Sequence, residues 1–243
     1  MGEDSAVAIG QPIAKVEYKG KELLYAIQND HCLWRCKTIF TKEPDTIEWI
    51  ESMAPGETLI DVGANIGIYT IFAAHLGLKV FAFEPEASNY ALLCRSITIN
   101  DFDVPAYPIA LSDCFKADWL YLSGYLPGGS VHTFGANLGH RLTEREHILK
   151  QGCISMPLDV FEIRADHIKI DVDGLEHVVI AGAMRTLRDV KSVLVEINEK
   201  LPAHLNLCAM LENLGFRSDP EQVAKARRSE GTFEGCGNRI FRR

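Results

Sequence analysis

The stretch Thr58-Leu59-Ile60-Asp61-Val62-Gly63-Ala64-Asn65-Ile66-Gly67-Ile68-Tyr69-Thr70 joins a short apolar strand to a glycine-bearing turn that opens a helix. Gly63 allows the backbone to turn tightly and to approach a ligand closely. We expect Gly67 to let the following helix pack against the strand with no side chain between them. A strand, a glycine turn and a helix in this order predict a cofactor site at the turn.

The spacing of these glycines indicates which kind of cofactor binds. The sequence has D-x-G-x-x-x-G, whereas a dinucleotide site has G-x-G-x-x-G with the pyrophosphate on the helix N-terminus. Asp61 stands just before the turn and would repel a phosphate. The ligand is therefore expected to carry positive charge, as a small molecule with an ammonium and a sulfonium does. The missing third glycine argues against a nicotinamide dehydrogenase.

A second acidic residue follows at the distance expected for a nucleoside site. Residues 79–84 read as the next buried strand, which ends in Glu84. In nucleoside-binding α/β folds, an acid about 20 residues after the glycine turn accepts hydrogen bonds from the ribose hydroxyls. The alternative is an ordinary solvated strand end. The combination of the turn and the acid favours the ribose role.

Strand and helix patterns alternate along the chain, which predicts an α/β fold with a mostly parallel seven-stranded sheet and helices on both faces. Gly77 and Gly215 are expected to follow the ends of two helices. The closing strand pair is expected near Phe216 and over 237–241. The other expected strands are 58–63, 79–84, 104–111, 167–174 and 192–198, and the expected helices are 66–76, 88–99, 176–187 and 203–214.

Two segments lie outside this alternation. The sequence of residues 1–54 predicts a hairpin followed by a helix that begins at Pro44. We expect this segment to form a flank or lid for a catalytic domain over 55–243. Residues 114–157 are rich in glycine and read as one long loop. Such a loop would lie at the carboxyl end of the sheet, where open α/β folds bind ligands, and is therefore expected to contact the substrate.

Composition excludes several classes of protein. The chain has 243 residues, 47% of them apolar, and a net charge of −8, which disfavours binding to a nucleic-acid backbone. No run approaches the about 18 apolar residues of a membrane span, and no signal peptide is evident. Seven scattered cysteines suit reduced thiols. We therefore expect a cytoplasmic protein with no membrane and no nucleic-acid partner.

Four motifs together carry a family resemblance: D-V-G-A-N-I-G-I-Y-T, F-E-P, I-K-I-D-V-D-G-L-E-H and V-L-V-E-I-N. From about Glu43 to Gly215 the chain resembles the FkbM family of class I S-adenosylmethionine-dependent methyltransferases. Asp173 stands where the family usually has Glu, and Leu175 where it has Ala. The resemblance implies a Rossmann-like fold, S-adenosylmethionine as cofactor, and methyl transfer to a hydroxyl of a sugar or other small molecule.

Three carboxylates in the third motif are the candidate catalytic residues. Asp171 and Asp173 are two apart on a strand and share a face, and Gly174 permits a turn that brings Glu176 to the next helix. Close like charges raise one another's pKa values, which favours a carboxylate able to accept a proton near neutral pH. Asp171 is the first choice for the base or substrate-orienting residue and Glu176 is the second, although Glu176 also fits a helix-dipole role without catalysis.

The candidate cofactor residues gather at the ends of the first three strands. We expect the Asn65 amide to bind the methionine carboxylate or the backbone, and Asp113 to accept from the adenine amino group. The full set is Asp61, Gly63, Ala64, Asn65, Gly67, Glu84, Pro85 and Asp113.

Other candidates are left open. Glu196 and Asn198 could join Asp171 around Mg²⁺, but such residues are common at strand ends, so no metal ligand is assigned. His132, His140 and His147 in the long loop are either bases or surface histidines. A cofactor-binding domain without catalysis, or a methyltransferase for protein or nucleic acid, remains the alternative. The sequence identifies neither the acceptor nor the oligomeric state.

Overall fold

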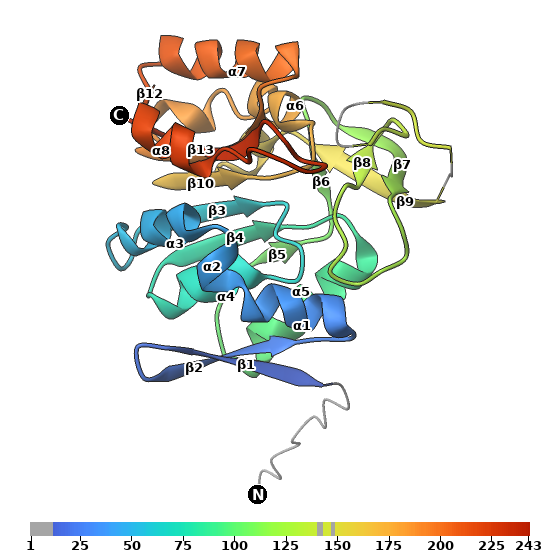
Figure 1. Cartoon of the computed structure of the whole chain (residues 1–243), viewed down its shortest axis with the longest axis vertical. Helices are drawn as coiled ribbons and strands as arrows, with labels where there is room; N and C mark the ends of the chain where they lie inside the picture. The colour runs from blue at the N-terminus through green and yellow to red at the C-terminus, as the bar shows by residue number, and fades with distance from the viewer. Residues whose placement is uncertain (1–11, 140–142, 147–148) are drawn as a thin grey trace, which may run out of the picture.

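The computed structural model describes residues 12–139, 143–146 and 149–243. Its centre is a seven-stranded sheet in the order β12-β13-β11-β10-β3-β4-β5 (Figure 1). Neighbouring strands from β11 to β5 are parallel, and β13 is antiparallel to both its neighbours. The predicted sheet is therefore confirmed. Its strands are β3 (Thr58–Val62), β4 (Lys79–Phe83), β5 (Ala106–Tyr107), β10 (His167–Ile170), β11 (Ser192–Asn198), β12 (Arg217–Ser218) and β13 (Cys236–Arg242).

Helices cover both faces of this sheet because successive strand residues point to opposite sides. Leu59 lies in one apolar cluster and Ile60 lies in the other. The first cluster includes side chains of α3 (Pro44–Glu51), α4 (Ile68–His75) and α5 (Ala87–Ile99). The second includes side chains of α6 (Glu176–Ala181) and α7 (Pro202–Asn213), while α8 (Pro220–Ala226) contacts β13. Positive φ angles at Gly77 and Gly215 match the predicted helix ends.

The N-terminal segment packs into the first cluster. The expected hairpin is present as β1 (Ile13–Tyr18) and β2 (Lys21–Ala26), and the helix started by Pro44 is α3. Two helices that the sequence did not predict, α1 (Asp30–Lys37) and α2 (Ile39–Lys42), lie between them. The indole N–H of Trp49 in α3 donates to the Ser192 hydroxyl at 2.8 Å. This buried contact joins the segment to the central sheet.

The prediction of one long loop over 114–157 was wrong, as was that of one strand over 104–111. The latter segment divides into β5 of the main sheet and β6 (Ala110–Leu111) of a second sheet with the order β6-β9-β7-β8. The other strands are β7 (Lys116–Leu122), β8 (Thr133–Phe134) and β9 (Leu149–Met156). Because β7 and β9 leave many side chains exposed, including Trp119 and Ile154, they lack the apolar runs of core strands.

Two elements are shorter than predicted. Strand β10 ends at Ile170, so Asp171 and Asp173 lie in the turn that follows it. Helix α6 ends at Ala181, and two 3₁₀ segments, Leu158–Phe161 and Thr186–Arg188, lie nearby. At Gly182 a Cβ atom would lie 2.0 Å from the Ser112 carbonyl oxygen. The backbone of Ser112 thus lies close to Gly182, directly after the last residue of α6.

Candidate active site

The glycine turn after β3 is built for close backbone approach. Gly63 has φ +75°, and a Cβ atom there would lie 1.9 Å from the carbonyl oxygen of Asp171. The N–H groups of Gly63 and Ala64 both donate to the carbonyl of Phe83, at 2.9 and 3.1 Å. Only glycine fits between these strand ends. Gly67 differs from expectation, since its missing Cβ makes room for Leu93 of α5, 2.7 Å away, rather than for the strand.

Glu84 lies at the end of β4, where the sequence placed it. Its carboxylate accepts from the N–H of Asn65 at 2.7 Å and from the N–H of Glu86 at 2.9 Å. Burial raises the pKa of Glu84 to about 7, despite these two N–H donors. The carboxylate therefore holds the turn in place and still lines the cavity.

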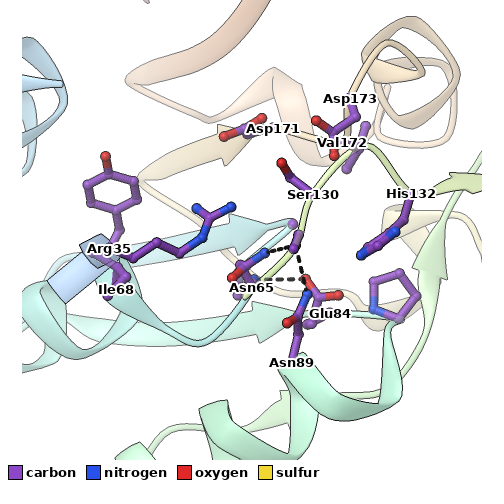
Figure 2. A pocket seen from close by; sticks show the side chains of 15 residues that line it. Arg35, Asn65, Ile68, Glu84, Asn89, Ser130, His132, Asp171, Val172 and Asp173 are labelled. Atoms are coloured by element: carbon purple, nitrogen blue, oxygen red, sulfur yellow. Dashed lines mark hydrogen bonds between the residues drawn. The ribbon is translucent and has the colours of Figure 1, made fainter. Parts of the chain in front are cut away.

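A polar cavity of about 90 Å³ opens at the carboxyl ends of β3, β4 and β10 (Figure 2). The predicted residues Gly63, Ala64, Asn65, Glu84, Pro85, Asp171 and Asp173 all line it. An apolar cavity of about 40 Å³, lined by Phe83 and by residues 109–111, adjoins it. Both cavities share Gly63, Pro85, His132 and Val172 as walls. The structure thus brings most of the predicted cofactor set to one place.

Asp171 and Asp173 form the acidic wall of the polar cavity. The Asp173 carboxylate accepts from the N–H of Val131 at 2.6 Å. Burial, followed by the charge of Asp171, raises the pKa of Asp173 to about 7. Burial also raises the pKa of Asp171, although Lys169 opposes that shift. Both carboxylates can therefore bind a proton closer to neutral pH than an exposed aspartate can.

Four predicted residues do not line either cavity: Gly67, described above, and Glu176, Asp113 and Asp61. Glu176 is fully buried, accepts from the N–H groups of Val172 and Gly174, and lies 3.0 Å from His204. Asp113 is exposed and accepts from the neighbouring Ser112 hydroxyl at 3.2 Å. Asp61 is fully buried below the turn and accepts from Thr70 at 2.7 Å. The positions of Asp61 and Glu176 suit support of the turn and helix better than ligand contact, while Asp113 lies at the surface.

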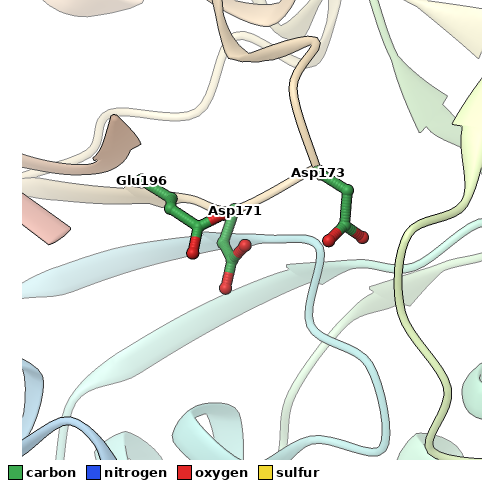
Figure 3. Close-up of side chains that lie close together, drawn as sticks. All are labelled: Asp171, Asp173 and Glu196. Carbon is green, nitrogen blue, oxygen red and sulfur yellow. The ribbon is translucent and has the colours of Figure 1, made fainter. Parts of the chain in front are cut away.

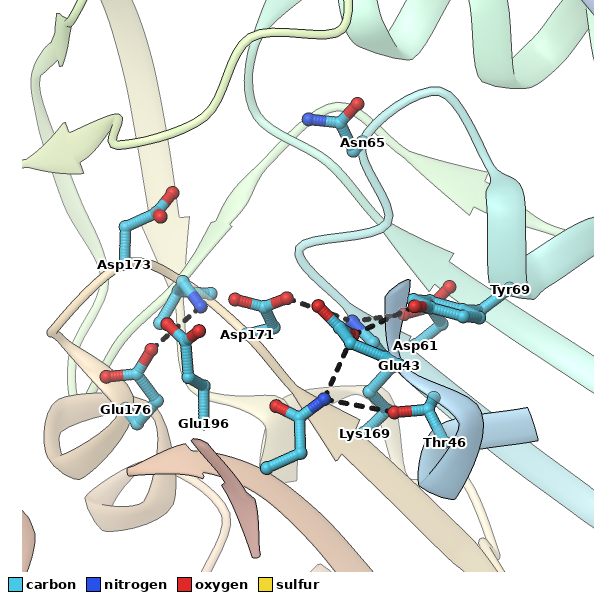
Figure 4. A network of polar contacts seen from close by, with 12 residues as sticks. Glu43, Thr46, Asp61, Asn65, Tyr69, Lys169, Asp171, Asp173, Glu176 and Glu196 are labelled. Atoms are coloured by element: carbon cyan, nitrogen blue, oxygen red, sulfur yellow. Dashed lines mark hydrogen bonds and ion pairs between the residues drawn. The ribbon is translucent and has the colours of Figure 1, made fainter. Parts of the chain in front are cut away.

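Lys169 explains why Asp61 faces inward (Figure 4). Its ammonium lies 3.3 Å from Asp61 and 3.8 Å from Asp171, and its side chain is 2% exposed. Burial lowers the pKa of Lys169, but Asp61, Asp171 and Glu43 outweigh it and raise that pKa above its usual value. A lysine inside an otherwise apolar strand, Ile168 to Ile170, was the sequence signal for this buried network.

Glu196 completes an acidic trio with Asp171 and Asp173, whose oxygens lie within 4.8 Å of one another (Figure 3). Asn198 is not part of it, because its side-chain oxygen accepts from the N–H of Lys200 at 3.0 Å. Arg228 lies 3.1 Å from Glu196 and already balances part of the charge. Since acidic groups are common at such edges, we assign no metal ligand here.

Residues 127–132, which we call the strap, cross the cavity. The carbonyl of Gly129 accepts from the side-chain amides of Asn65 and Asn89, at 2.6 and 3.2 Å. The Asn89 side chain also accepts from the N–H of Gly128 at 2.7 Å, and Asn29 donates to Pro127 at 2.9 Å. The strap is thereby attached to three separate helices or turns, and it adds Gly129, Ser130 and His132 to the cavity wall.

His132 is the histidine that the structure places at the site. Burial lowers its pKa to about 4, so its ring is neutral at pH 7. His140 and His147 lie outside the described residues. Sequence reasoning did not single out the other lining residues Arg35, Asn89 and Ser130, because no motif marks them.

The parallel sheet with its glycine turn after β3 has the fold of class I methyltransferases. A solved structure of the same fold is the magnesium protoporphyrin IX methyltransferase ChlM of Synechocystis with bound S-adenosylmethionine. It has a TM-score of 0.51 and 10% identity, with 90% of this chain and 86% of that one covered.

The family follows from the sequence match. Residues 61–218 match the model of the methyltransferase FkbM domain, so the chain belongs to that family of S-adenosylmethionine-dependent methyltransferases. The 31-O-demethyl-FK506 methyltransferase FkbM of Streptomyces tacrolimicus is 27% identical over 70% of this chain and 76% of its own length. The hexuronic acid methyltransferase AglP of Haloferax volcanii is 24% identical over 79% and 76%. No helix in the described part of the chain could cross a membrane.

Proposed function

We propose that this enzyme transfers a methyl group from S-adenosylmethionine to a hydroxyl oxygen of a sugar or another small molecule. The observation that carries the proposal is the pair of carboxylates, Asp171 and Asp173, with raised pKa values beside the cofactor turn. The names of the two relatives, one a 31-O-demethyl-FK506 methyltransferase and one a hexuronic acid methyltransferase, support a small-molecule acceptor.

The residues around the cavity fit the cofactor. Gly63 leaves a space that any Cβ would fill, and Glu84 offers a carboxylate to ribose hydroxyls. The apolar cavity beside Pro85 suits a flat aromatic base. The cofactor supplies an activated methyl group. Asp61 and Gly67 also belong to the predicted set, and in our proposal they support the site from outside the cavity. The exposed Asp113 has no role in it.

The chain's own part in the reaction is to hold the acceptor and remove its proton. Alignment of the reacting atoms supplies much of the rate enhancement in such transfers. We assign Asp171 as the base that takes the proton of the acceptor hydroxyl. Its carboxylate faces the cavity, and its side chain keeps 29% of its surface exposed. Asp173 holds the strap through Val131 and adds negative charge beside the base. Glu176 then acts as a positioning residue for the turn that carries both aspartates.

Entry of the cofactor requires the strap to shift. Ligand pockets usually measure about 300 to 1,000 Å³. The two cavities, of about 90 and 40 Å³, are smaller than that. Hydrogen bonds from Asn65 and Asn89 to Gly129 close the cavity. We therefore expect the predicted substrate segment 114–157 to contribute by opening and closing the site through residues 127–132.

The net charge bears on the class of acceptor, and the cysteines bear on the cellular compartment. The net charge of −8 disfavours a nucleic-acid acceptor. The seven cysteines are all unpaired, which supports a reducing compartment such as the cytoplasm. A cofactor-binding domain without catalysis is the competing function, and it predicts binding with no turnover.

The first test is calorimetric titration with S-adenosylhomocysteine, with NAD as the parallel control. We expect saturable binding of the former alone. Asp171→Asn should then keep this binding and lose turnover of hydroxylated acceptors by about 100-fold or more, because its amide cannot take the proton. Full activity in that variant would remove Asp171 from the chemistry. Binding of neither compound by the folded protein would overturn the proposed function.

A further inference from the structure

Arg35 is the one lysine or arginine among the described residues that line the polar cavity. The other charged walls are the carboxylates of Glu84, Asp171 and Asp173, and His132 is neutral at pH 7. A cavity with several carboxylates and a single guanidinium matches a zwitterion with more positive than negative groups. S-adenosylmethionine carries a sulfonium, an ammonium and one carboxylate.

Helix α1 holds Arg35 in place. The Asn29 side chain caps this helix by accepting from the N–H of Cys32 at 2.8 Å, and Arg35 lies in its last turn. The Arg35 Nε–H donates to the carbonyl of Gly128 in the strap. The described part of the chain gives Arg35 no salt bridge within 4 Å, so its terminal N–H groups are available to a ligand anion.

The position of Arg35 relative to Glu84 indicates which ligand group it meets. Figure 2 shows Arg35 and Glu84 on opposite sides of Asn65. With the ribose at Glu84, a cofactor lying along the turn from Gly63 to Asn65 would bring its amino-acid part to Arg35. The Asn65 amide, which the sequence suggested for the carboxylate, already donates to Gly129, and its oxygen accepts from Ile66. The guanidinium is the cationic donor that the described lining residues place at this end of the cavity.

We propose that Arg35 binds the carboxylate of the amino-acid portion of S-adenosylmethionine, an inference that rests on cofactor binding in the proposed function. A planar guanidinium can donate two parallel hydrogen bonds to a carboxylate, which lysine cannot reproduce. Arg35 lies before residues 61–218, the part of the chain that matches the family model. The N-terminal segment thus completes the cofactor site.

Two ligands that differ only in the carboxylate test this assignment through measurements of binding, without an activity assay. We would titrate wild type and Arg35→Met with S-adenosylhomocysteine and with its decarboxylated analogue, which lacks only the carboxylate. In wild type, loss of the carboxylate should lower affinity by about 10- to 100-fold. Arg35→Met should lower affinity for S-adenosylhomocysteine by a similar factor and leave affinity for the analogue within about twofold. The affinity of Arg35→Lys for S-adenosylhomocysteine should lie between those of wild type and Arg35→Met.

Lys37→Met is the matched control, because Lys37 is exposed in the same turn of α1. It should bind both ligands as wild type does, and thermal melts should show all variants folded. Equal losses for both ligands in Arg35→Met would mean a general distortion and would overturn the assignment. Unchanged binding of S-adenosylhomocysteine would also overturn it, and would leave an acceptor carboxylate as the alternative partner. Absence of any binding by wild type would instead count against the proposed function.

Discussion

Glu84 combines two tasks in one buried carboxylate. It accepts from two backbone N–H groups that shape the cofactor turn, and it faces the cavity. Ribose hydroxyls would donate to its ionised form. Because burial raises its pKa to about 7, part of the free protein carries a proton there at neutral pH.

This predicts a pH-dependent affinity. If the ionised carboxylate binds the ribose, as proposed, the proton must leave on binding, and S-adenosylhomocysteine affinity should fall as the pH drops below about 7. Glu84→Gln should reduce affinity by about 10- to 100-fold and abolish this dependence between pH 6 and 8. Calorimetry at several pH values measures both effects. A wild-type affinity that does not vary over this range would contradict the ribose role.

Asp61 illustrates a residue whose position was predicted and whose partner was not. The strand register pairs Asp61 with Lys169, and the two side chains form a fully buried ion pair. Removing one partner of such a pair leaves an uncompensated buried charge. Replacement of Asp61 is therefore expected to act on stability before it acts on the cofactor.

At the level of elements, the N-terminal segment contributes to the core as well as to the site. Trp49 of α3 is 1% exposed, donates to Ser192 of β11, and has its ring nearly perpendicular to that of His167. Helix α1 of the same segment carries Arg35 to the cavity. The segment therefore stabilises the sheet and completes one wall of the site.

Trp49→Ala should destabilise the fold by about 3 to 5 kcal/mol, because it leaves a large cavity and removes the indole donor to the Ser192 hydroxyl. Urea unfolding of the variant measures this. The control is Trp34→Ala in α1, where the side chain is 44% exposed and a change within about 0.5 kcal/mol is expected. Equal effects of the two substitutions would show that α3 is not anchored in the way described.

At the level of the whole molecule, buried acids concentrate at one edge of the sheet. Glu84, Asp171, Asp173 and Glu196 all have raised pKa values, and burial is the largest cause for each. Without a cationic ligand, ionising these groups costs stability. The free protein is thus expected to be sensitive to pH in a range where most proteins are not.

Asp173 tests this. Its carboxyl ionises near 3.8 in the unfolded chain and near 7 in the fold, so the folded state binds the extra proton between these values. Stability should fall as pH rises through this window. Asp173→Asn removes the effect, so its Tm should exceed that of wild type by about 2–4 °C at pH 8, and by less at pH 5. Equal Tm differences at both pH values would contradict the shifted pKa.

The sequence by itself determined the order of strands and helices in the parallel core, the glycine turn and the acids at the strand ends. These features depend on local patterns: apolar runs, glycine between them, and a carboxylate where a strand stops. Local patterns were therefore enough to place Gly63, Glu84, Asp171 and Asp173 at one edge, since parallel strands end on the same side.

Only the tertiary structure decided which of those acids face the cavity and what closes it. Asp61 turns inward because Lys169 meets it from a neighbouring strand, and Glu176 turns to the backbone N–H groups and His204. Arg35 meets Gly128 across 93 positions of sequence. Such partners are set by how distant segments pack, and a local pattern contains no information about them. The strap and its polar contacts were unpredictable for the same physical reason.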